Sequence, residues 1–352
     1  MKRYDAAAFL VPPDSSVRLA LNVIDKNKEG IALVAGSDRR LLGLITDGDI
    51  RRFMLRGNSL DRPCSEAMCA TPFTLSEKAS PEEIVAGFSG KRIRHIPLLD
   101  QNRVAIALVC QFAGAAEVEA RTAVIMAGGE GRRLRPITES IPKPMIQIKG
   151  RPLLEITIER LVSYGIRRII LAVNYKANII EDHFGDGARF GVQVEYLREK
   201  QKLGTVGALA LLDERPRDPF LVMNGDIITD IDIRRFLDFH TSHRSILTIA
   251  SIQYNMNIPF GVLEHSGPFV LSVTEKPSHS FLCNAGMYVV DPELIDRIPA
   301  GTYYDMTSLV SDLIASGLAV HTFPIHESWI DVGQKKDLIQ ADGDYSAAIV
   351  DG

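Results

Sequence analysis

A glycine-rich segment directly after a short apolar run limits what this chain can fold into. Residues 122–126, Thr-Ala-Val-Ile-Met, are typical of a buried strand, and residues 127–131, Ala-Gly-Gly-Glu-Gly, follow at once. Gly128, Gly129 and Gly131 let the backbone turn tightly and come close to a ligand, because they carry no Cβ to collide with it. The pattern therefore predicts a strand, a tight turn and a backbone cradle.

Positive charge accompanies this turn. Arg132 and Arg133 follow the last glycine, and Lys143 stands between Pro142 and Pro144. Backbone N–H groups of such a turn can bind phosphate oxygens, and guanidinium and ammonium groups favour a triphosphate beside them. The spacing fits neither a Walker A loop nor the Gly-x-Gly-x-x-Gly dinucleotide fingerprint. The alternative is a glycine-rich turn between strand and helix with basic surface residues.

The segment from Gly128 to Pro144 resembles the signature of the sugar-1-phosphate nucleotidylyltransferases, GGxGxRLxPxTxxxPKP, and matches every specified position. The resemblance implies a Rossmann-like mixed-sheet domain that joins an NTP to a sugar-1-phosphate and releases pyrophosphate. It also implies that Arg133 and Lys143 are catalytic. The residues implied to bind the nucleotide here are Ala127, Gly128, Gly129, Gly131 and Arg132, the last standing where the family often has Thr.

Two later aspartates are candidates for metal ligands. Asn224-Gly225-Asp226 follows an apolar run, and Trp329-Ile-Asp331-Val-Gly333 resembles the WxDxG motif of the same family. The resemblance implies that Asp226 and Asp331 hold one Mg²⁺ together, and Mg²⁺ prefers a few carboxylate oxygens with phosphates and water. The alternative for either residue alone is a turn Asp that bonds its own backbone.

Three further motifs fit the family. Residues 203–208, Leu-Gly-Thr-Val-Gly-Ala, resemble LGTAGA, which implies a nucleotide contact at Gly204 and Thr205, with Thr205 capping the next helix; Lys202 precedes them where relatives often have Pro. Residues 275–277 resemble EKP, so Lys276 would place the sugar phosphate and is counted as catalytic. Residues 284–288 resemble NAGxY. The implied sugar-binding residues are Gly261, Glu275, Asn284 and Gly286, with Asn174 and Tyr175 as weaker candidates at a strand end.

Residues before Arg121 contain two copies of one pattern, about 10–58 and 61–118. Each copy has an amphipathic helix, a short apolar strand, a turn, a second strand and another helix. The elements located in the sequence are 17–24, 31–34, 41–45 and 49–55 in the first copy, and 80–88, 95–99 and 104–109 in the second. The repeat resembles a pair of CBS domains, small α/β modules. The first copy keeps the family's Gly-x-x-Thr-x-x-Asp pattern as Gly43, Thr46 and Asp49, which implies a regulatory nucleotide at Thr46 and Asp49. The alternative is that Thr46 caps the helix and the module only mediates dimerisation.

Strands and helices alternate after residue 121, as in an α/β sheet. A helix is expected from Pro152 and strands at 168–173, 192–197 and 219–223; strands near 246–252, 262–264, 269–275 and 287–290 suggest an antiparallel edge. A helical tail is expected at 335–350. The predicted domains are thus a tandem CBS regulatory module in 1–120 and a catalytic domain in 121–352.

Bulk properties exclude some classes of protein. The net charge of −4 argues against a general nucleic-acid or membrane-surface binder, and no stretch approaches the roughly 20 apolar residues of a membrane span. The four cysteines lack CxxC spacing and indicate free thiols in a reducing cytoplasm. We therefore expect a cytoplasmic protein that forms homo-oligomers through its CBS modules.

CBS pairs ahead of a compact transferase resemble a bacterial subgroup that supplies GDP-sugars for surface glycans. This resemblance favours GTP with glucosamine-1-phosphate or mannose-1-phosphate, and a uridylyltransferase or another nucleotidylyltransferase is the alternative within the family. A catalytically retired, nucleotide-sensing protein is the alternative of another class. Since the signature Arg133 and both aspartates are present, the sequence favours the Mg²⁺-dependent enzyme.

Overall fold

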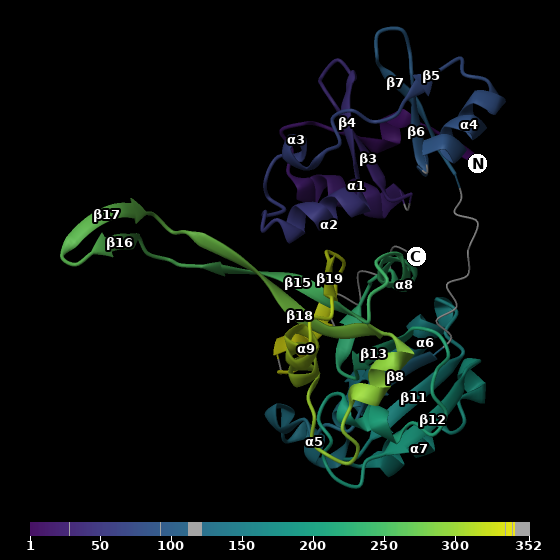
Figure 1. Ribbon diagram of the computed structural model, residues 1–352, viewed down its shortest axis with the longest axis vertical. Helices are drawn as coiled ribbons and strands as arrows, with labels where there is room; N and C mark the ends of the chain where they lie inside the picture. The colour runs from purple at the N-terminus through teal and green to yellow at the C-terminus, as the bar shows by residue number, and fades with distance from the viewer. Residues whose placement is uncertain (28, 92, 112–121, 335, 340, 342–352) are drawn as a thin grey trace. The chain divides into compact units, whose positions relative to one another are not determined.

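The computed structural model describes the chain except for residues 28, 92, 112–121, 335, 340 and 342–352 (Figure 1). It forms two compact units. One contains residues 1–116 and 253–281, and the other contains residues 117–252 and 282–352. The second unit is therefore interrupted by a long insertion that belongs with the first.

The N-terminal repeat forms two small sheets. One has the order β1-β7-β6-β5 and the other the order β2-β3-β4. The strands are β1 (Lys2–Asp5), β2 (Leu10–Val11), β3 (Ile31–Ala35), β4 (Leu41–Thr46), β5 (Leu75–Ser76), β6 (His95–Leu99) and β7 (Ala105–Cys110), and the helices are α1 (Val17–Asn27), α2 (Asp47–Leu55), α3 (Cys64–Ala67) and α4 (Pro81–Lys91). The elements located in the sequence are confirmed, with ends shifted by at most three residues, and most of the stretch where the last helix of the second copy was expected lies outside the described residues.

Helical spacing explains how each copy buries its helix. In the first copy Val17, Leu21 and Ile24 of α1 are buried in one cluster with Val34 of β3 and Ile45 of β4. The second copy uses the same arrangement, since Ile84 and Phe88 of α4 pack against β6 and β7. Apolar side chains at i, i+3, i+4 and i+7 place such a stripe against a sheet.

The second unit contains a seven-stranded sheet with the order β12-β11-β8-β13-β18-β15-β19. Its first four strands are parallel, and β18 runs antiparallel to β13. The strands are β8 (Thr122–Met126), β11 (Arg168–Val173), β12 (Gln193–Arg198), β13 (Phe220–Asn224), β15 (Leu247–Asn257), β18 (Ser278–Val290) and β19 (Val320–Ile325). The fold is a mixed α/β sheet, as predicted.

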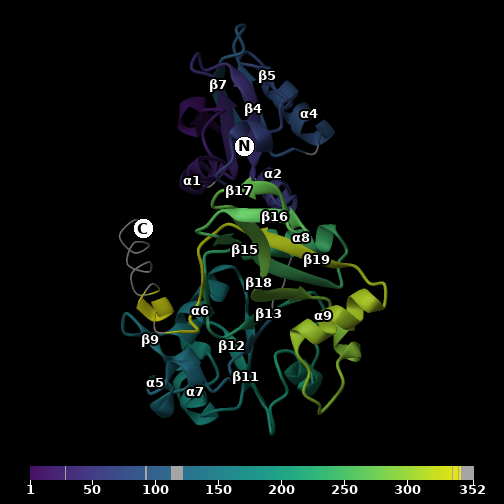
Figure 2. The same ribbon diagram turned by 90° about the vertical axis from the view of Figure 1, so that its left-hand side faces the viewer.

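Helices cover both faces of this sheet (Figure 2). Side chains of α6 (Leu153–Ser163), α7 (Ala177–Phe184) and α8 (Ile233–Ser242) pack on one face, and those of α9 (Met306–Ala315) pack on the other. Successive residues of a strand point to opposite faces, so Ile125 of β8 lies in the first layer and Val124 in the second. This double cover explains why these strands are continuous apolar runs.

One topological expectation is confirmed in strand direction, since β18 and β13 and also β16 (Val262–Ser266) and β17 (Phe269–Thr274) pair antiparallel, but is wrong in position. The sequence suggested an antiparallel edge built from the later strands, but β18 lies inside the sheet, between β13 and β15. The outer strand is β19, which the sequence analysis did not predict. Its Val-His-Thr-Phe-Pro-Ile sequence contains Pro324, which an edge strand tolerates because one side of it needs no ladder bond.

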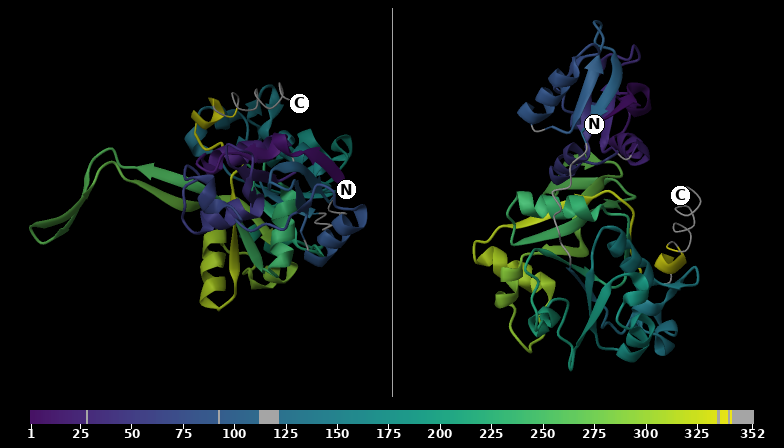
Figure 3. Two further views of the ribbon diagram at one scale, coloured as in Figure 1. Left: turned by 90° about the horizontal axis from the view of Figure 1, so that it is seen from above. Right: turned by 90° about the vertical axis from the view of Figure 1, so that its right-hand side faces the viewer.

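The insertion is a two-stranded antiparallel ribbon of β16 (Val262–Ser266) and β17 (Phe269–Thr274), drawn in green in Figures 1 and 3. It is carried by β15 and β18, which are longer than predicted. Of the expected tail, residues 336–339 and 341 are helical and most of the rest lies outside the described residues. All four cysteines are free thiols, and no described helix is long and apolar enough to cross a bilayer.

Candidate active site

The glycine-rich loop is held at both of its sides by neighbouring strand ends. The Ala127 N–H donates to the Ala172 carbonyl at 2.8 Å, and the Gly225 N–H donates to the Met126 carbonyl at 2.9 Å. A Cβ at Gly128 would lie 3.1 Å from the Asn174 Cβ, so a side chain there would fit only if its neighbour shifted by a few tenths of an ångström. Gly131 has a φ of 62°, which favours glycine. The strand expected at 122–126 is confirmed as β8, and the backbone cradle after it stays a prediction.

The first basic residue after the loop, Arg132, pairs with a nearby carboxylate. Arg132 is exposed, and its Nε donates to Glu130 Oε2 at 2.7 Å. Lys202 also pairs with Glu130, so the Lys that replaces the common Pro links its own loop to the glycine loop. Hydrogen bonds from Arg132 and Lys202 lower the pKa of Glu130 to about 2. Arg132 therefore forms an ion pair with the Glu130 carboxylate.

Two short strands bring the predicted metal ligands together. Asp226 immediately precedes β14 (Ile227–Thr229) and Asp331 ends β20 (Trp329–Asp331), and these strands pair antiparallel with Ile227 opposite Asp331. The Val332 N–H donates to the Asp226 carbonyl at 2.9 Å and completes the link. Residues about a hundred positions apart in the chain thus meet at the end of the parallel sheet.

Lys143 lies between the two carboxylates. Its side chain is buried, its Nζ contacts Asp226 Oδ2, and Asp331 Oδ1 is 3.7 Å from the same nitrogen. Arg133 is close enough to act on the charge of Asp331, and a Cβ at Gly333 would lie 3.7 Å from its Nη2. The four predicted residues Arg133, Lys143, Asp226 and Asp331 therefore form one cluster.

The electrostatics of this cluster fit a divalent cation. Asp226 Oδ1 is buried and has no hydrogen-bond partner among the described residues. Burial raises the pKa of Asp331, the Asp226 charge raises it further, and Lys143 and Arg133 oppose the rise. Buried carboxylate oxygens normally have partners, so an unpaired one beside a second carboxylate suits a hard cation.

The predicted sugar-binding motif adjoins the same sheet end. Asn284 Oδ1 accepts from the Gly286 N–H at 2.8 Å, and Asn284 Nδ2 donates to the Tyr288 hydroxyl at 2.8 Å. Gly286 has a φ of 69°, and a Cβ there would lie 2.6 Å from Asn224 Nδ2. The Asn-Ala-Gly and Asn-Gly-Asp motifs therefore touch, and only glycine fits between them.

Trp329 joins the third motif to this neighbourhood. Its Nε1 donates to the Ala285 carbonyl at 2.9 Å. Sequence reasoning gave Trp329 and Asn224 no role beyond their motifs. Trp329 holds the backbone next to Gly286 through this hydrogen bond, and the Asn224 side chain lies against Gly286; the motif spacing alone gave no signal for either contact.

Thr205 is used differently from the expectation. The sequence suggested that it caps the helix after it, but the segment after it is a 3₁₀ turn, η5 (Gly207–Leu211). The Thr205 hydroxyl instead accepts from the Met306 N–H at 2.8 Å, at the start of α9, and the Thr205 N–H donates to Asp305 Oδ1 at 3.0 Å. Gly204 has a φ of 79° and lies against the Tyr304 carbonyl. This loop is therefore fastened to α9, and its contact with a nucleotide stays a prediction.

Three predicted residues belong to the first unit. Gly261, Glu275 and Lys276 flank the two strands of the ribbon and are exposed, whereas Asn284 and Gly286 belong to the second unit. A Cβ at Gly261 would lie 2.9 Å from Glu275 Oε2, so these two are neighbours. The two segments that flank the ribbon therefore lie side by side at Gly261 and Glu275.

The predicted CBS ligand site is occupied by a helix cap. The Asp49 N–H donates to Thr46 Oγ1 at 3.3 Å, and Asp49 Oδ2 accepts from the Thr46 N–H at 2.9 Å and from the Thr46 hydroxyl at 2.6 Å. This reciprocal capping box starts α2. The described residues therefore form the helix cap that was the alternative to a ligand site. Binding of a nucleotide at Thr46 and Asp49 stays a prediction.

The weaker candidates at the end of β11 make structural contacts. Asn174 Nδ2 donates to the Glu199 carbonyl at 3.0 Å, and the Tyr175 hydroxyl donates to the Thr138 carbonyl at 3.0 Å. Glu199 is half buried, its carboxylate accepts from the Leu203 N–H at 3.1 Å, and burial raises its pKa. These residues tie the glycine loop to the 203–208 loop.

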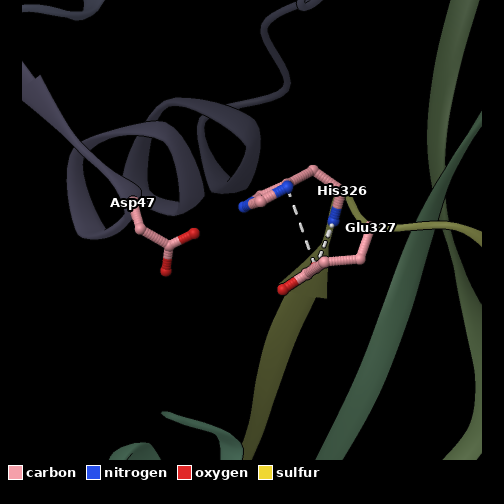
Figure 4. Close-up of side chains that lie close together, drawn as sticks. All are labelled: Asp47, His326 and Glu327. Atoms are coloured by element: carbon pink, nitrogen blue, oxygen red, sulfur yellow. Dashed lines mark hydrogen bonds and ion pairs between the residues drawn. The ribbon is translucent and has the colours of Figure 1, made fainter. Parts of the chain in front are cut away.

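Two acidic residues near the C-terminal strands escaped the sequence analysis. Asp337 Oδ2 accepts from the Gly333 and Gln334 N–H groups at 3.1 and 2.7 Å, which fixes the turn after Asp331. Glu327 lies beside His326, after β19, and its Oε2 accepts from the His326 N–H at 2.9 Å (Figure 4). Neither residue stands in a motif that could have marked it.

Comparison with known proteins agrees with this geometry. A family model described as nucleotidyl transferase matches residues 122–347, and a CBS domain model matches residues 6–56. The chain is 35% identical over 229 residues to a mannose-1-phosphate guanylyltransferase of Mycobacterium tuberculosis, covering 63% of this chain and 64% of that protein. It is 35% identical over 240 residues to a UTP–glucose-1-phosphate uridylyltransferase of Synechocystis, covering 62% of each. The chain thus spans less than two thirds of the length of these relatives.

A solved structure, HddC from Yersinia pseudotuberculosis, superposes with a TM-score of 0.50 at 28% identity and covers 64% of this chain and 99% of that one. The same protein has been solved in complex with GMP-PN. The shared portion corresponds in size to the second unit with its ribbon.

Proposed function

The chain belongs to the nucleotidyl transferase family, and we propose that it is a sugar-1-phosphate nucleotidylyltransferase that uses Mg²⁺ and prefers GTP. The reaction joins an NTP to a sugar-1-phosphate and gives an NDP-sugar and pyrophosphate. The observation that carries the proposal is the meeting of Arg133, Lys143, Asp226 and Asp331 at one end of the sheet. Two cationic and two anionic side chains at such a place suit a triphosphate and its cation.

Such a reaction needs positioning more than it needs a protein nucleophile. The attacking group is already an anionic phosphate oxygen, so the barrier lies mainly in charge repulsion and alignment. Arg133 and the amides of the glycine loop hold the triphosphate, and Lys143 offsets charge near the site of attack. Gly128 and Gly131 allow the close approach, because side chains there would meet Asn174 and Thr138.

Asp226 and Asp331 are the residues that would hold Mg²⁺. When bound, such an ion neutralises phosphate charge and orients the phosphate for in-line attack. The buried Asp226 Oδ1, which has no hydrogen-bond partner among the residues that the structure describes, is the feature of this chain that fits the ion. Asn224 and Trp329 keep the surrounding backbone in place through their contacts with residues 285 and 286.

We assign GTP ahead of UTP, with mannose-1-phosphate or glucosamine-1-phosphate as the sugar substrate. The guanylyltransferase relative and the GMP-PN complex of HddC support GTP. The uridylyltransferase relative at equal identity supports UTP as the second candidate. The nucleobase is selected by a few hydrogen bonds, and a wrong partner leaves polar groups of the pocket unpaired.

Pyrophosphate release tests the proposal. The purified chain is assayed with Mg²⁺ and each of GTP, UTP, CTP, ATP and dTTP, crossed with a panel of sugar-1-phosphates. We expect release that requires one NTP and one sugar phosphate together, and that stops when EDTA is added. A folded protein that is silent across the panel would contradict the proposed activity and favour the nucleotide-sensing alternative.

A further inference from the structure

The two candidate metal ligands are held in place by different means. The Asp226 side chain is 24% exposed, and its carboxylate contacts the Lys143 ammonium. The Asp331 side chain is 46% exposed, Lys143 Nζ is 3.7 Å from it, and its carboxylate accepts no hydrogen bond from the part of the chain that the structure describes. A metal ligand without such contacts is held only as firmly as the backbone that carries it.

The backbone after Asp331 is held by Asp337. The N–H groups of Gly333 and Gln334 both donate to Asp337 Oδ2, at 3.1 and 2.7 Å. Strand β20 ends at Asp331, so its pairing with β14 does not reach these two N–H groups. Hydrogen bonds to an ionised carboxylate are stronger than those between neutral groups. Asp337 therefore fixes the turn that strand pairing leaves unsupported.

The segment that carries Asp337 is itself anchored in the core. Asp337 and Leu338 lie in a helical segment. Leu338 packs against a buried apolar cluster that contains Ile330 and Val332, the residues on either side of Asp331. The helical segment and the end of β20 are thus packed together, and close packing transmits a displacement of one to the other.

Asp337 acts on Asp331 more through these hydrogen bonds than through its charge. Burial raises the pKa of Asp331 most, and the Asp337 charge adds less to the rise than the Asp226 charge does. A Cβ at Gly333 would lie 3.4 Å from Asp331 Oδ1 and 3.7 Å from Asp337 Oδ2, so the two carboxylates flank this glycine. Asp337 Oδ2 already accepts from two N–H groups, so this oxygen serves the turn.

We propose that Asp337 is a positioning residue that keeps the Asp331 carboxylate beside Asp226 by holding the turn after Asp331. The inference rests on the proposed function for the identity of the site as a cation site. Loss of a side chain that orients a metal ligand typically weakens metal binding by about ten- to a hundredfold. Replacement of Asp337 should therefore weaken cation binding and leave turnover with saturating cation nearly unchanged.

Mn²⁺ binding followed by electron paramagnetic resonance tests this role without any assay of activity, because Mn²⁺ suits the same oxygen ligands as Mg²⁺. The full-length wild type, Asp337→Ala and Asp337→Asn are titrated with Mn²⁺. We expect the dissociation constant to rise about tenfold or more in Asp337→Ala and to return toward the wild-type value in Asp337→Asn, whose amide oxygen can accept both hydrogen bonds. An unchanged constant in Asp337→Ala, an equal rise in both variants, or a wild type that binds no Mn²⁺ would overturn the inference.

Asp232→Ala is a matched control for the loss of a helix cap. Asp232 Oδ1 accepts from the Arg234 and Arg235 N–H groups at 3.0 and 3.2 Å at the start of α8, so one oxygen again serves two backbone donors. We expect thermal unfolding to show lower stability in both Asp232→Ala and Asp337→Ala, and Mn²⁺ binding to weaken only in Asp337→Ala. Equal weakening in both variants would show that lost stability accounts for the effect, and the positioning role would fall.

Pyrophosphate release measured against Mg²⁺ concentration separates this inference from the proposed function. We expect the half-saturating Mg²⁺ concentration of Asp337→Ala to rise by about the same factor as the Mn²⁺ dissociation constant, and kcat at saturating Mg²⁺ to stay within about twofold of the wild type. A lower kcat with an unchanged half-saturating concentration would contradict the positioning role. If the wild type releases no pyrophosphate, the proposed function fails, and the Mn²⁺ titrations still decide whether Asp337 supports a cation site.

Discussion

Two regions of this molecule place a carboxylate shortly after a strand and use it differently. At the start of α2 the Asp49 carboxylate accepts from the Thr46 backbone and hydroxyl, so its oxygens serve its own helix. At the end of the seven-stranded sheet, Asp226 Oδ1 is buried and has no hydrogen-bond partner in the described part of the chain, and Lys143 and Asp331 lie around the carboxylate. Residues of the same type thus form a cap where local backbone satisfies them and a candidate ligand site where it does not.

The largest expected effect is a loss of enzyme activity when Asp226 is replaced. Asp226→Asn removes the charge that would hold the cation, so we expect pyrophosphate release to fall by a factor of about a hundred or more. The rate of pyrophosphate release by Arg133→Ala should fall by a similar factor. Asp230→Asn is a matched control, because Asp230 is exposed, follows β14 and pairs with Arg160. Near-normal turnover of Asp226→Asn would remove the metal-site assignment.

Removal of Lys143 tests whether its ammonium neutralises the aspartates. Lys143→Met leaves Asp226 and Asp331 without their nearest positive charge. We therefore expect the free energy of unfolding in EDTA to fall by about 2 kcal/mol. That loss is smaller than the loss at a fully buried ion pair, because the Asp331 side chain is 46% exposed. Added Mg²⁺ should stabilise the variant more than the wild type, which thermal unfolding with and without the ion measures. Lys202→Met is the control and should change the free energy of unfolding less than Lys143→Met does, because the Lys202 side chain is exposed. Equal responses of the wild type and Lys143→Met to Mg²⁺ would contradict this account.

The capping box predicts a change in stability and none in catalysis. Thr46→Val keeps the shape of the side chain and removes its hydrogen bonds, so α2 should lose about 1 kcal/mol while the rate of pyrophosphate release is unchanged. Thermal unfolding and the pyrophosphate assay measure the two quantities. If AMP or ATP raised the unfolding temperature of the wild type and not of Thr46→Val, the ligand-binding interpretation of this site would be favoured instead.

The smallest expected effect is a shift in the pH at which cation binding is lost. Burial and the Asp226 charge raise the pKa of Asp331, so Asp331 keeps its proton to a higher pH than an ordinary aspartate. Cation binding should therefore weaken as pH falls through this raised pKa, and the acidic limb of the pH profile should lie above the one expected for a pKa of 3.8. Lys143 opposes the rise, so Lys143→Met should move the loss of Mg²⁺-dependent stabilisation to still higher pH. A loss at the same pH in both proteins would show that Lys143 does not act on this carboxylate.

The sequence predicted the elements near the motifs well because each rests on a local physical rule. The apolar run 122–126 is confirmed as β8, and the stripe of Val17, Leu21 and Ile24 is confirmed as the buried face of α1. Strand β19 was missed because His321 and Pro324 interrupt any simple apolar pattern. The place of β18 inside the sheet depends on pairing with β13, which a strand's own residues do not encode.

The sequence by itself determined which residue types are available and where the backbone must turn: glycines at 128 and 131, basic residues at 133 and 143, and aspartates at 226 and 331. Only the tertiary structure decided which of them have partners. It placed Lys143 between two aspartates that are about a hundred residues apart, engaged Arg132 with Glu130, and fastened Thr205 to α9. The physical reason is that hydrogen bonding and burial depend on neighbours brought by strand pairing, so one residue type becomes a cap, a surface ion pair or a buried charge according to what surrounds it.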